Sequence, residues 1–176
     1  MKRFWMFAAL CAAPLAHAHV TIDPASAPAG AYQRLAFRVG HGCEGSATTA
    51  ITVQIPDGVA GAKPMPKPGW TISTTEAKLA APVQSHGKPV TTRVAQISWR
   101  GGPLPDAWYD EFVMQVKLPD APGRYAFKVA QVCEKGRVDW TGIPAAGAHA
   151  DTPAPVLEVL APGGDMSGMA GMPHHH

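Results

Sequence analysis

The stretch "EFVMQVKL", residues 111–118, decides the fold, because a large apolar residue recurs at every second position. Successive side chains of a β-strand point to opposite faces of the sheet, so this spacing predicts a strand with one buried face. That face carries Phe112, Met114, Val116 and Leu118. The stretch "ITVQI", residues 51–55, repeats the pattern with Ile51, Val53 and Ile55. Glu111 falls on the opposite face, away from the apolar row.

Further candidate strands follow along the chain, and turn signals separate them. The candidates are "HVTI" (19–22), "RLAFRV" (34–39), "WTIST" (70–74), "VTTRVAQISW" (90–99), "RYAFKVAQVC" (124–133) and "PVLEVL" (155–160). The 18 Gly and 18 Pro gather in joints such as "PDG" (56–58), "KPMPKPG" (63–69) and "PDAPG" (119–123). Eight or nine short strands with frequent turns predict an all-β domain, a β-sandwich or a small barrel.

The first 18 residues have the features of a secretory signal peptide. Lys2 and Arg3 precede the apolar run "FWMFAALCAAPLA", which is too short to span a membrane. Ala16-His17-Ala18 supplies small residues at the positions that signal peptidase reads, so we expect cleavage between Ala18 and His19. The protein is then periplasmic or secreted. We expect a single domain over residues 19–161, followed by a flexible tail over residues 162–176.

Cleavage would leave two cysteines, Cys43 and Cys133. An even pair in an exported protein indicates a disulfide, and the alternative is a pair of thiolate metal ligands. Without Lys2 and Arg3 the remaining 13 Lys and Arg match 13 Asp and Glu. This balance does not favour nucleic acid or an anionic membrane surface as a partner.

His19 would become the first residue of the processed chain. A free α-amine and the Nδ1 atom of the same histidine can close a chelate ring on one metal ion, and two nitrogens in a plane suit the tetragonal preference of Cu(II). Because "HVTI" starts a strand directly, the amine would be fixed to the sheet. Candidate partners are Glu111 and Trp140, since an indole can shield a metal, while Asp139 is an alternative carboxylate. The simpler interpretations are that Glu111 is an ordinary solvated glutamate and that Trp140 is a packed tryptophan.

Five segments together resemble the YcnI-like copper-binding domain family: "HVTIDP", "GCEGSATTAITVQIPDGV", "PKPGW", "ISWRGGPLPDAWYDEFVMQV" and "QVCEKGRVDW". The resemblance covers about His19 to Leu160. It implies an exported β-sandwich, cupredoxin-like or Ig-like in build and with one disulfide, that binds Cu(II) at a single-histidine brace. It places the chelating histidine at His19, an oxygen ligand at Glu111 in "YDEF", and a tryptophan beside the metal at Trp140 in "CEKGRVDW".

The resemblance also suggests a role in copper handling, with other periplasmic copper chaperones or membrane copper transporters as partners. We expect a binding protein and not an enzyme, as a monomer or weak dimer. Delivery, storage and sensing remain open.

The tail carries a second candidate metal site. Thioethers suit Cu(I) and imidazoles accept either copper state. The candidate ligands are Met166, Met169, Met172, His174, His175 and His176. A structureless tail, or histidines left from a purification tag, would explain part of this pattern without metal.

Two other functions stay open. A copper-dependent oxidative enzyme of the polysaccharide monooxygenase kind would need a second histidine near His19. The other histidines, His41, His86 and His149, lie in loop-like segments and are interpreted as exposed loop residues. A metal-free structural or adhesive sandwich is the second alternative.

Overall fold

A computed structural model describes residues 19–85, 87–144 and 148–162, without the side chains of residues 84 and 85. This part of the chain consists of strands and connecting segments, so the prediction of an all-β protein is confirmed. The strands are β1 (Thr21–Asp23), β2 (Ser26–Pro28), β3 (Tyr32–Val39), β4 (Thr48–Gln54), β5 (Ala60–Pro64), β6 (Trp70–Ser85), β7 (Lys88–Leu104), β8 (Asp110–Lys117), β9 (Gly123–Ala126), β10 (Val129–Cys133), β11 (Arg137–Trp140) and β12 (Val156–Leu160).

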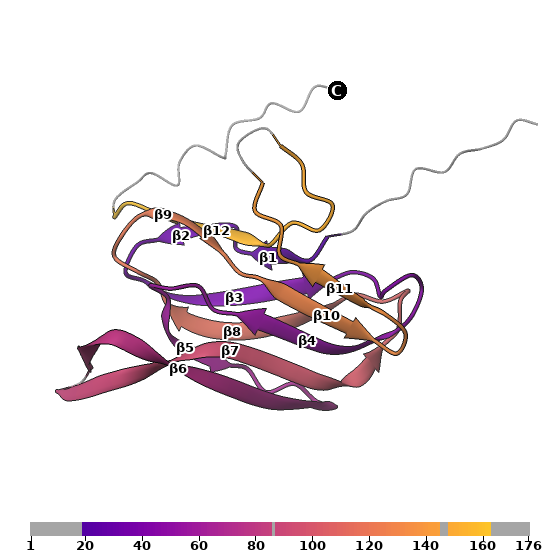
Figure 1. The fold of residues 1–176 in the computed structure, drawn as a ribbon, viewed down its shortest axis with the longest axis horizontal. Coiled ribbons are helices and arrows are strands. Elements are labelled where there is room, and N and C mark those ends of the chain that lie inside the picture. Colours follow the sequence, from indigo (N-terminus) through magenta and orange to yellow (C-terminus); the bar gives the residue numbers. More distant parts are fainter. Residues whose placement is uncertain (1–18, 86, 145–147, 163–176) are drawn as a thin grey trace, which may run out of the picture.

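The strands form three sheets (Figure 1). One has the order β1-β3-β8-β5, the second β11-β10-β4-β7-β6, and a small third sheet has the order β2-β12-β9. β6 and β7 are long, and their hairpin extends past the rest of the sandwich. The described residues form twelve strands, more than the eight or nine expected, because β2, β5 and β11 show no apolar repeat and the segment 124–133 forms two strands.

The alternating patterns fill the space between the two larger sheets. On β8 the side chains of Phe112, Met114 and Val116 are fully buried, and Ile51 and Val53 of β4 are buried from the facing sheet. Burial of such side chains stabilises each by about 1.5–3 kcal/mol relative to exposure. The buried faces predicted for residues 111–118 and 51–55 are therefore confirmed.

The segment 124–133 is not one strand, as its sequence suggests. It breaks at Phe127 and Lys128, so β9 pairs with β12 while β10 pairs with β4. Strands that switch between sheets in this way form the corners of sandwiches. Phe127 sits at the corner, fully buried, with its ring centroid 5.5 Å from that of Phe37 on β3.

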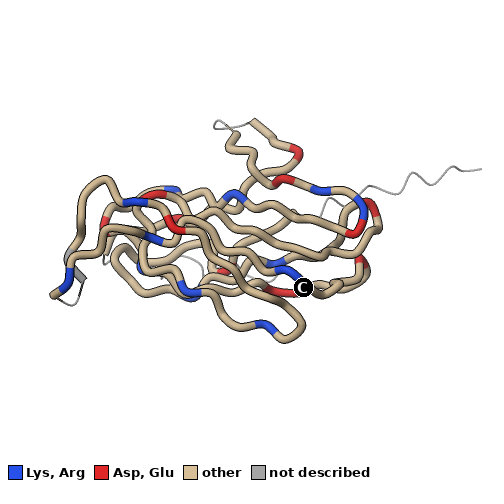
Figure 2. Tube along the Cα trace, turned by 60° about the horizontal axis from the view of Figure 1, so that its bottom comes forward, with Lys and Arg blue, Asp and Glu red and all other residues tan. Residues whose placement is uncertain are grey.

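A disulfide joins Cys43 and Cys133, with Cα atoms 5.9 Å apart across a sequence separation of 90 residues. The predicted pairing is confirmed, and the alternative of two thiolate metal ligands is wrong. The bond ties the loop after β3 to the end of β10. Positions of acidic and basic residues alternate along the described part of the Cα trace (Figure 2), in line with the balanced charge in the sequence.

Candidate metal centre

Trp140 ends β11 with its side chain turned into the protein and only 4% exposed. Its indole Nε1–H donates to Oε1 of Gln131 on β10, at 3.0 Å. The Gln131 side chain is itself fully buried, and its Nε2 donates to the His41 carbonyl at 2.7 Å and to Thr48 Oγ1 at 2.8 Å. Because a buried polar group without a partner is costly, these bonds fix the orientation of the amide and, through it, of the indole.

His19 lies against this indole. The two ring centroids are 5.8 Å apart and the rings meet edge to face at 80°. The pairing of β1 with β3, in which Thr21 opposes Arg38, leads the preceding residues toward the end of β3 and the loop beyond it. The structure therefore brings together His19 and Trp140, two residues that are 121 positions apart in sequence.

His41 lies against the same indole, with ring centroids 5.9 Å apart and an interplanar angle of 73°. The sequence predicts an exposed loop histidine at His41, which is wrong, because His41 is half-buried and in contact with Trp140. Its position directly before Gly42 and Cys43 was the available signal, because the disulfide fixes this loop. We call His19, His41, Gln131 and Trp140 the indole cluster.

Glu111 lies in a different setting, at the start of β8. It opposes Arg38 of β3, whose Nε donates to Glu111 Oε1 at 2.9 Å, and Arg34 Nη2 donates to Oε2 at 3.2 Å. Arg38 also pairs with Asp23 of β1 at 3.2 Å. The bond from Arg38 lowers the pKa of the Glu111 carboxyl; partial burial opposes this effect and Arg34 adds to it.

We call Asp23, Arg34, Arg38 and Glu111 the arginine–carboxylate row. Glu111 is level with Thr21 across β3, whereas His19 precedes Thr21 by two residues. The Glu111 carboxylate thus accepts hydrogen bonds from arginines, whereas the His19 ring contacts the indole of Trp140. Among the described residues, no group of three or more His, Cys, Asp and Glu side chains is arranged to hold a metal ion.

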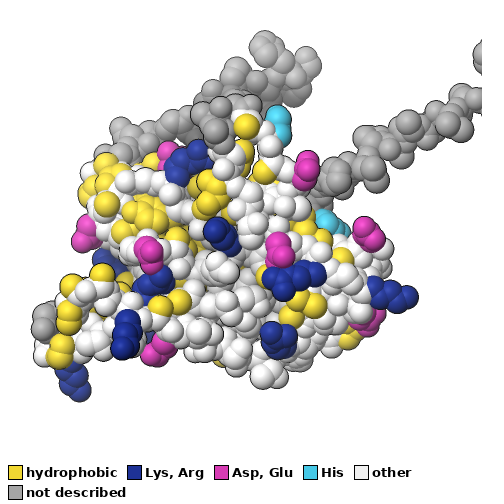
Figure 3. Space-filling model, viewed as in Figure 1, with side chains coloured by type: hydrophobic (Ala, Val, Ile, Leu, Met, Phe, Trp, Pro, Cys, Tyr) yellow, Lys and Arg dark blue, Asp and Glu magenta, His cyan; other side chains and the backbone are white. Residues whose placement is uncertain are grey.

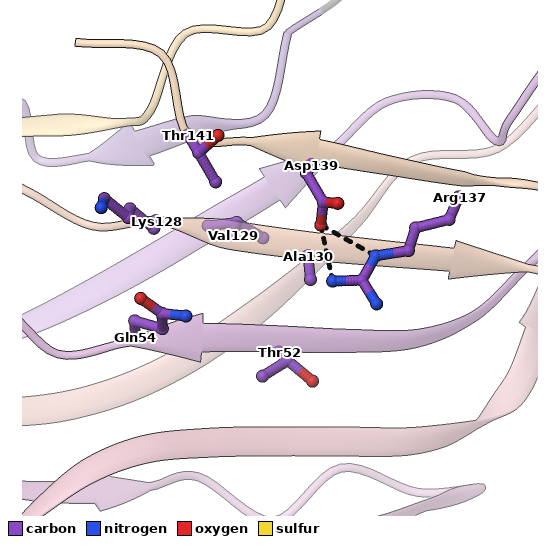
Figure 4. A pocket seen from close by; sticks show the side chains of 8 residues that line it. All are labelled: Thr52, Gln54, Lys128, Val129, Ala130, Arg137, Asp139 and Thr141. Carbon is purple, nitrogen blue, oxygen red and sulfur yellow. Dashed lines mark hydrogen bonds and ion pairs between the residues drawn. The ribbon is translucent and has the colours of Figure 1, made fainter.

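Asp139, the alternative carboxylate, points away from the indole cluster. It accepts from Nε of Arg137 at 2.9 Å on the outer face of β11. Both line a shallow hollow of about 250 Å³ over β4, β10 and β11, together with Thr52, Gln54 and Thr141 (Figure 4). Since alternate residues of a strand face opposite sides, this hollow and the Trp140 ring lie on opposite faces of the sheet.

His149 is exposed in the segment after β11. Histidine side chains reach the surface on the face seen in Figure 3, where acidic and basic side chains also lie close together. Residues 1–18, which we predict to be a signal peptide, His86 and the candidate tail ligands from Met166 to His176 lie outside the described residues. Within the described ranges, no helix is long and apolar enough to cross a membrane.

Comparison with known proteins finds a solved structure, a curated relative and a protein family that are similar to this chain. A solved structure is similar to this chain, described as a crystal structure of an uncharacterized protein from Nocardia farcinica that reveals an immunoglobulin-like fold. The TM-score is 0.63 at 30% identity, and the match covers 80% of this chain and 97% of that one. The expected Ig-like build is therefore confirmed.

A curated relative is copper-binding protein CutI of Bacillus subtilis (strain 168), 26% identical over 147 residues. The match covers 82% of this chain, and this chain spans 63% of the length of CutI. The family model "Domain of unknown function (DUF1775)" matches residues 19–159. These matches agree with the resemblance seen in the five sequence segments, and the chain belongs to the DUF1775 family.

Proposed function

We propose that this protein is an exported, non-enzymatic copper-binding protein that holds Cu(II) through the α-amine and ring nitrogen of His19, next to Trp140. The contact between these two rings carries the proposal, because the residues selected by chelate chemistry and by family resemblance lie side by side. The copper-binding relative CutI supports the choice of metal. The proposal requires cleavage between Ala18 and His19.

The surroundings of His19 fit a Cu(II) chelate. The chain enters β1 two residues later, so its first residue has little conformational freedom to lose on binding. The indole of Trp140 is held by Gln131 and presents an apolar, polarisable surface at the metal position. Such a wall excludes water from one side and can add a weak cation–π attraction.

Glu111 is proposed as the oxygen ligand. The arginines that lower the pKa of its carboxyl also keep it ionised at neutral pH, which a carboxylate ligand requires. Each carboxylate oxygen accepts from one arginine, and we expect Glu111 to exchange at least one of these bonds for a bond to copper at His19. The arginine–carboxylate row would thus keep Glu111 in place until copper binds. The carboxylate then replaces an exposed ion pair, which is weak in water, by a bond to the metal.

In the cell envelope, such a site would serve copper trafficking or homeostasis. The methionines Met166, Met169 and Met172 and the histidines His174, His175 and His176 would form a second, softer site for Cu(I). A tract of methionines and histidines can capture copper and pass it to a periplasmic chaperone or a membrane transporter. The proposed domain spans residues 19–161, and the tail begins at residue 162.

A copper-dependent oxidative enzyme is the second candidate, because His41 supplies the second histidine near His19 that this chemistry needs. Incubation of the copper-loaded protein with a polysaccharide and a reductant distinguishes the two. We expect no oxidised sugar products; their copper-dependent appearance would establish the enzymatic alternative. A metal-free adhesive domain would show no Cu(II) binding at micromolar concentration.

The main test compares two proteins with mass-verified first residues, one starting at His19 and one with a single glycine before it. The extension converts the amine into an amide and should weaken Cu(II) binding at least about a hundredfold, since even supporting residues of metal sites contribute tenfold to a hundredfold. Calorimetry gives the affinity, and thermal unfolding without metal checks that the fold is unchanged. Equal affinity of the two proteins would refute the proposed chelate.

A further inference from the structure

We propose that His41 is a third nitrogen ligand of the same copper ion, through its Nε2 atom. This inference rests on the proposed function and deepens it, since it changes the donor set from one imidazole to two. The observation behind it is that the rings of His19 and His41 both lie edge-on to the one indole of Trp140, at 5.8 and 5.9 Å.

The backbone places His41 near His19. β1 and β3 are antiparallel, with Thr21 opposite Arg38. Continuing this register beyond the strands sets the residues before Thr21 beside those after Arg38, so His19 faces the start of the loop that contains His41. The two imidazoles thus enter the same region from adjacent chain segments.

The position of the proton on the His41 ring favours metal binding through the Nε2 atom. Its Nδ1 atom lies 2.5 Å from the Gly42 carbonyl oxygen, and a carbonyl can only accept. Nδ1–H is therefore the donor, and the lone pair of the neutral ring is on Nε2. Histidine ligands commonly have this arrangement, in which the far ring nitrogen donates to a carbonyl and fixes the tautomer.

The loop that carries His41 is fixed on several sides. Gln131 Nε2 donates to the His41 carbonyl, and the Gly42 N–H donates to Asp106 Oδ1 at 2.8 Å. A Cβ at position 42 would lie 1.8 Å from the Ser46 carbonyl oxygen, so only glycine permits this close turn. The disulfide of Cys43 then ties the turn to β10.

The same Gln131 side chain therefore bonds both the indole of Trp140 and the backbone of His41. A ligand held in place before binding loses little entropy when the metal arrives. The amine and Nδ1 of His19 with Nε2 of His41 make three nitrogen donors. Nitrogen donors of this kind suit the tetragonal preference of Cu(II).

The experiment uses the full processed chain with His174, His175 and His176 replaced by alanine, so that the tail adds no imidazole. One equivalent of Cu(II) is added to this background and to His41→Asn and His41→Ala variants, with His149→Ala as matched control. Asparagine keeps a donor for the turn but has no ring nitrogen. Pulsed EPR counts the imidazoles bound to copper, calorimetry gives the affinity, and circular dichroism confirms the fold.

We expect two coupled imidazoles in the background protein and in His149→Ala, and one in both His41 variants, with affinity reduced about tenfold or more. One imidazole in the background protein, or an unchanged count in His41→Asn, would overturn the role of His41. The protein with one glycine before His19 distinguishes failure of the role of His41 from failure of the whole copper site. If that extension abolishes binding while the His41 variants change nothing, the proposed function stands and this inference is wrong.

Discussion

The indole cluster and the arginine–carboxylate row supply different parts of the proposed copper site, and they are built in different ways. In the cluster, Trp140 and Gln131 are buried and joined by hydrogen bonds that leave their side chains one orientation. In the row, Glu111 is 29% exposed and is held by the longer, half-exposed side chains of Arg34 and Arg38. The comparison indicates that the nitrogen side of the proposed site is organised in advance, whereas its oxygen side is held by partly exposed ion pairs.

The largest expected effect concerns the disulfide that anchors the indole cluster. Replacing Cys43 and Cys133 together by serine should lower the free energy of unfolding by about 4 kcal/mol, because the bond closes a loop of 90 residues. Urea denaturation of the oxidised protein and the variant measures the difference. A loss below about 1 kcal/mol would show that the cluster does not depend on this anchor.

A smaller loss should follow from Trp140→Phe. The variant keeps most of the buried ring but removes the N–H that Gln131 Oε1 accepts. Leaving that buried oxygen unsatisfied should lower the free energy of unfolding by about 1–3 kcal/mol.

Trp108→Phe is the matched control for this change. Trp108 is 66% exposed, and its replacement should change stability by less than about 0.5 kcal/mol. Chemical denaturation compares the two variants. Equal effects would mean that the hydrogen bond from Trp140 is not part of what holds the cluster together.

The smallest expected effect is in the row. Glu111→Gln should lower the free energy of unfolding by less than about 1 kcal/mol, because exposed ion pairs are screened by water. Glu158→Gln on β12, an exposed site outside the row, provides the control.

The sign of the pH dependence follows from the lowered pKa of Glu111. The folded state binds the proton more weakly than the unfolded state, so the contribution of Glu111 is complete above the ordinary pKa of 4.5 and is lost as the pH falls through the folded value. The free energies of unfolding of the unsubstituted protein and of Glu111→Gln, measured from pH 7 downward, should converge below that ordinary pKa. A difference that grows on acidification would contradict this assignment.

The sequence was sufficient for the features that depend on local pattern. The alternation in residues 111–118 predicted the buried face of β8, and the count of two cysteines after the predicted signal peptide predicted their pairing. Family resemblance pointed to His19 and Trp140. The structure adds that their rings are in contact.

Features that depend on register could not be read from the sequence. The partners of Glu111 are Arg34 and Arg38, which are 77 and 73 residues away and become neighbours only when β3 pairs with β8. His41 has no periodicity to mark it, because it lies in a loop whose course is set by a disulfide and a buried glutamine. A long-range loop contact of this kind is set by the tertiary structure and not by any local sequence pattern.

The measurement that most directly tests the central claim locates copper relative to the tryptophans. Processed protein labelled with 5-fluorotryptophan should give separate ¹⁹F NMR signals for Trp70, Trp99, Trp108 and Trp140, with Trp140→Phe identifying the last. One equivalent of paramagnetic Cu(II) should broaden the Trp140 signal beyond detection and affect it more strongly than the other three signals. A Trp140 signal that stays sharp while copper is bound would contradict a copper site at the indole cluster.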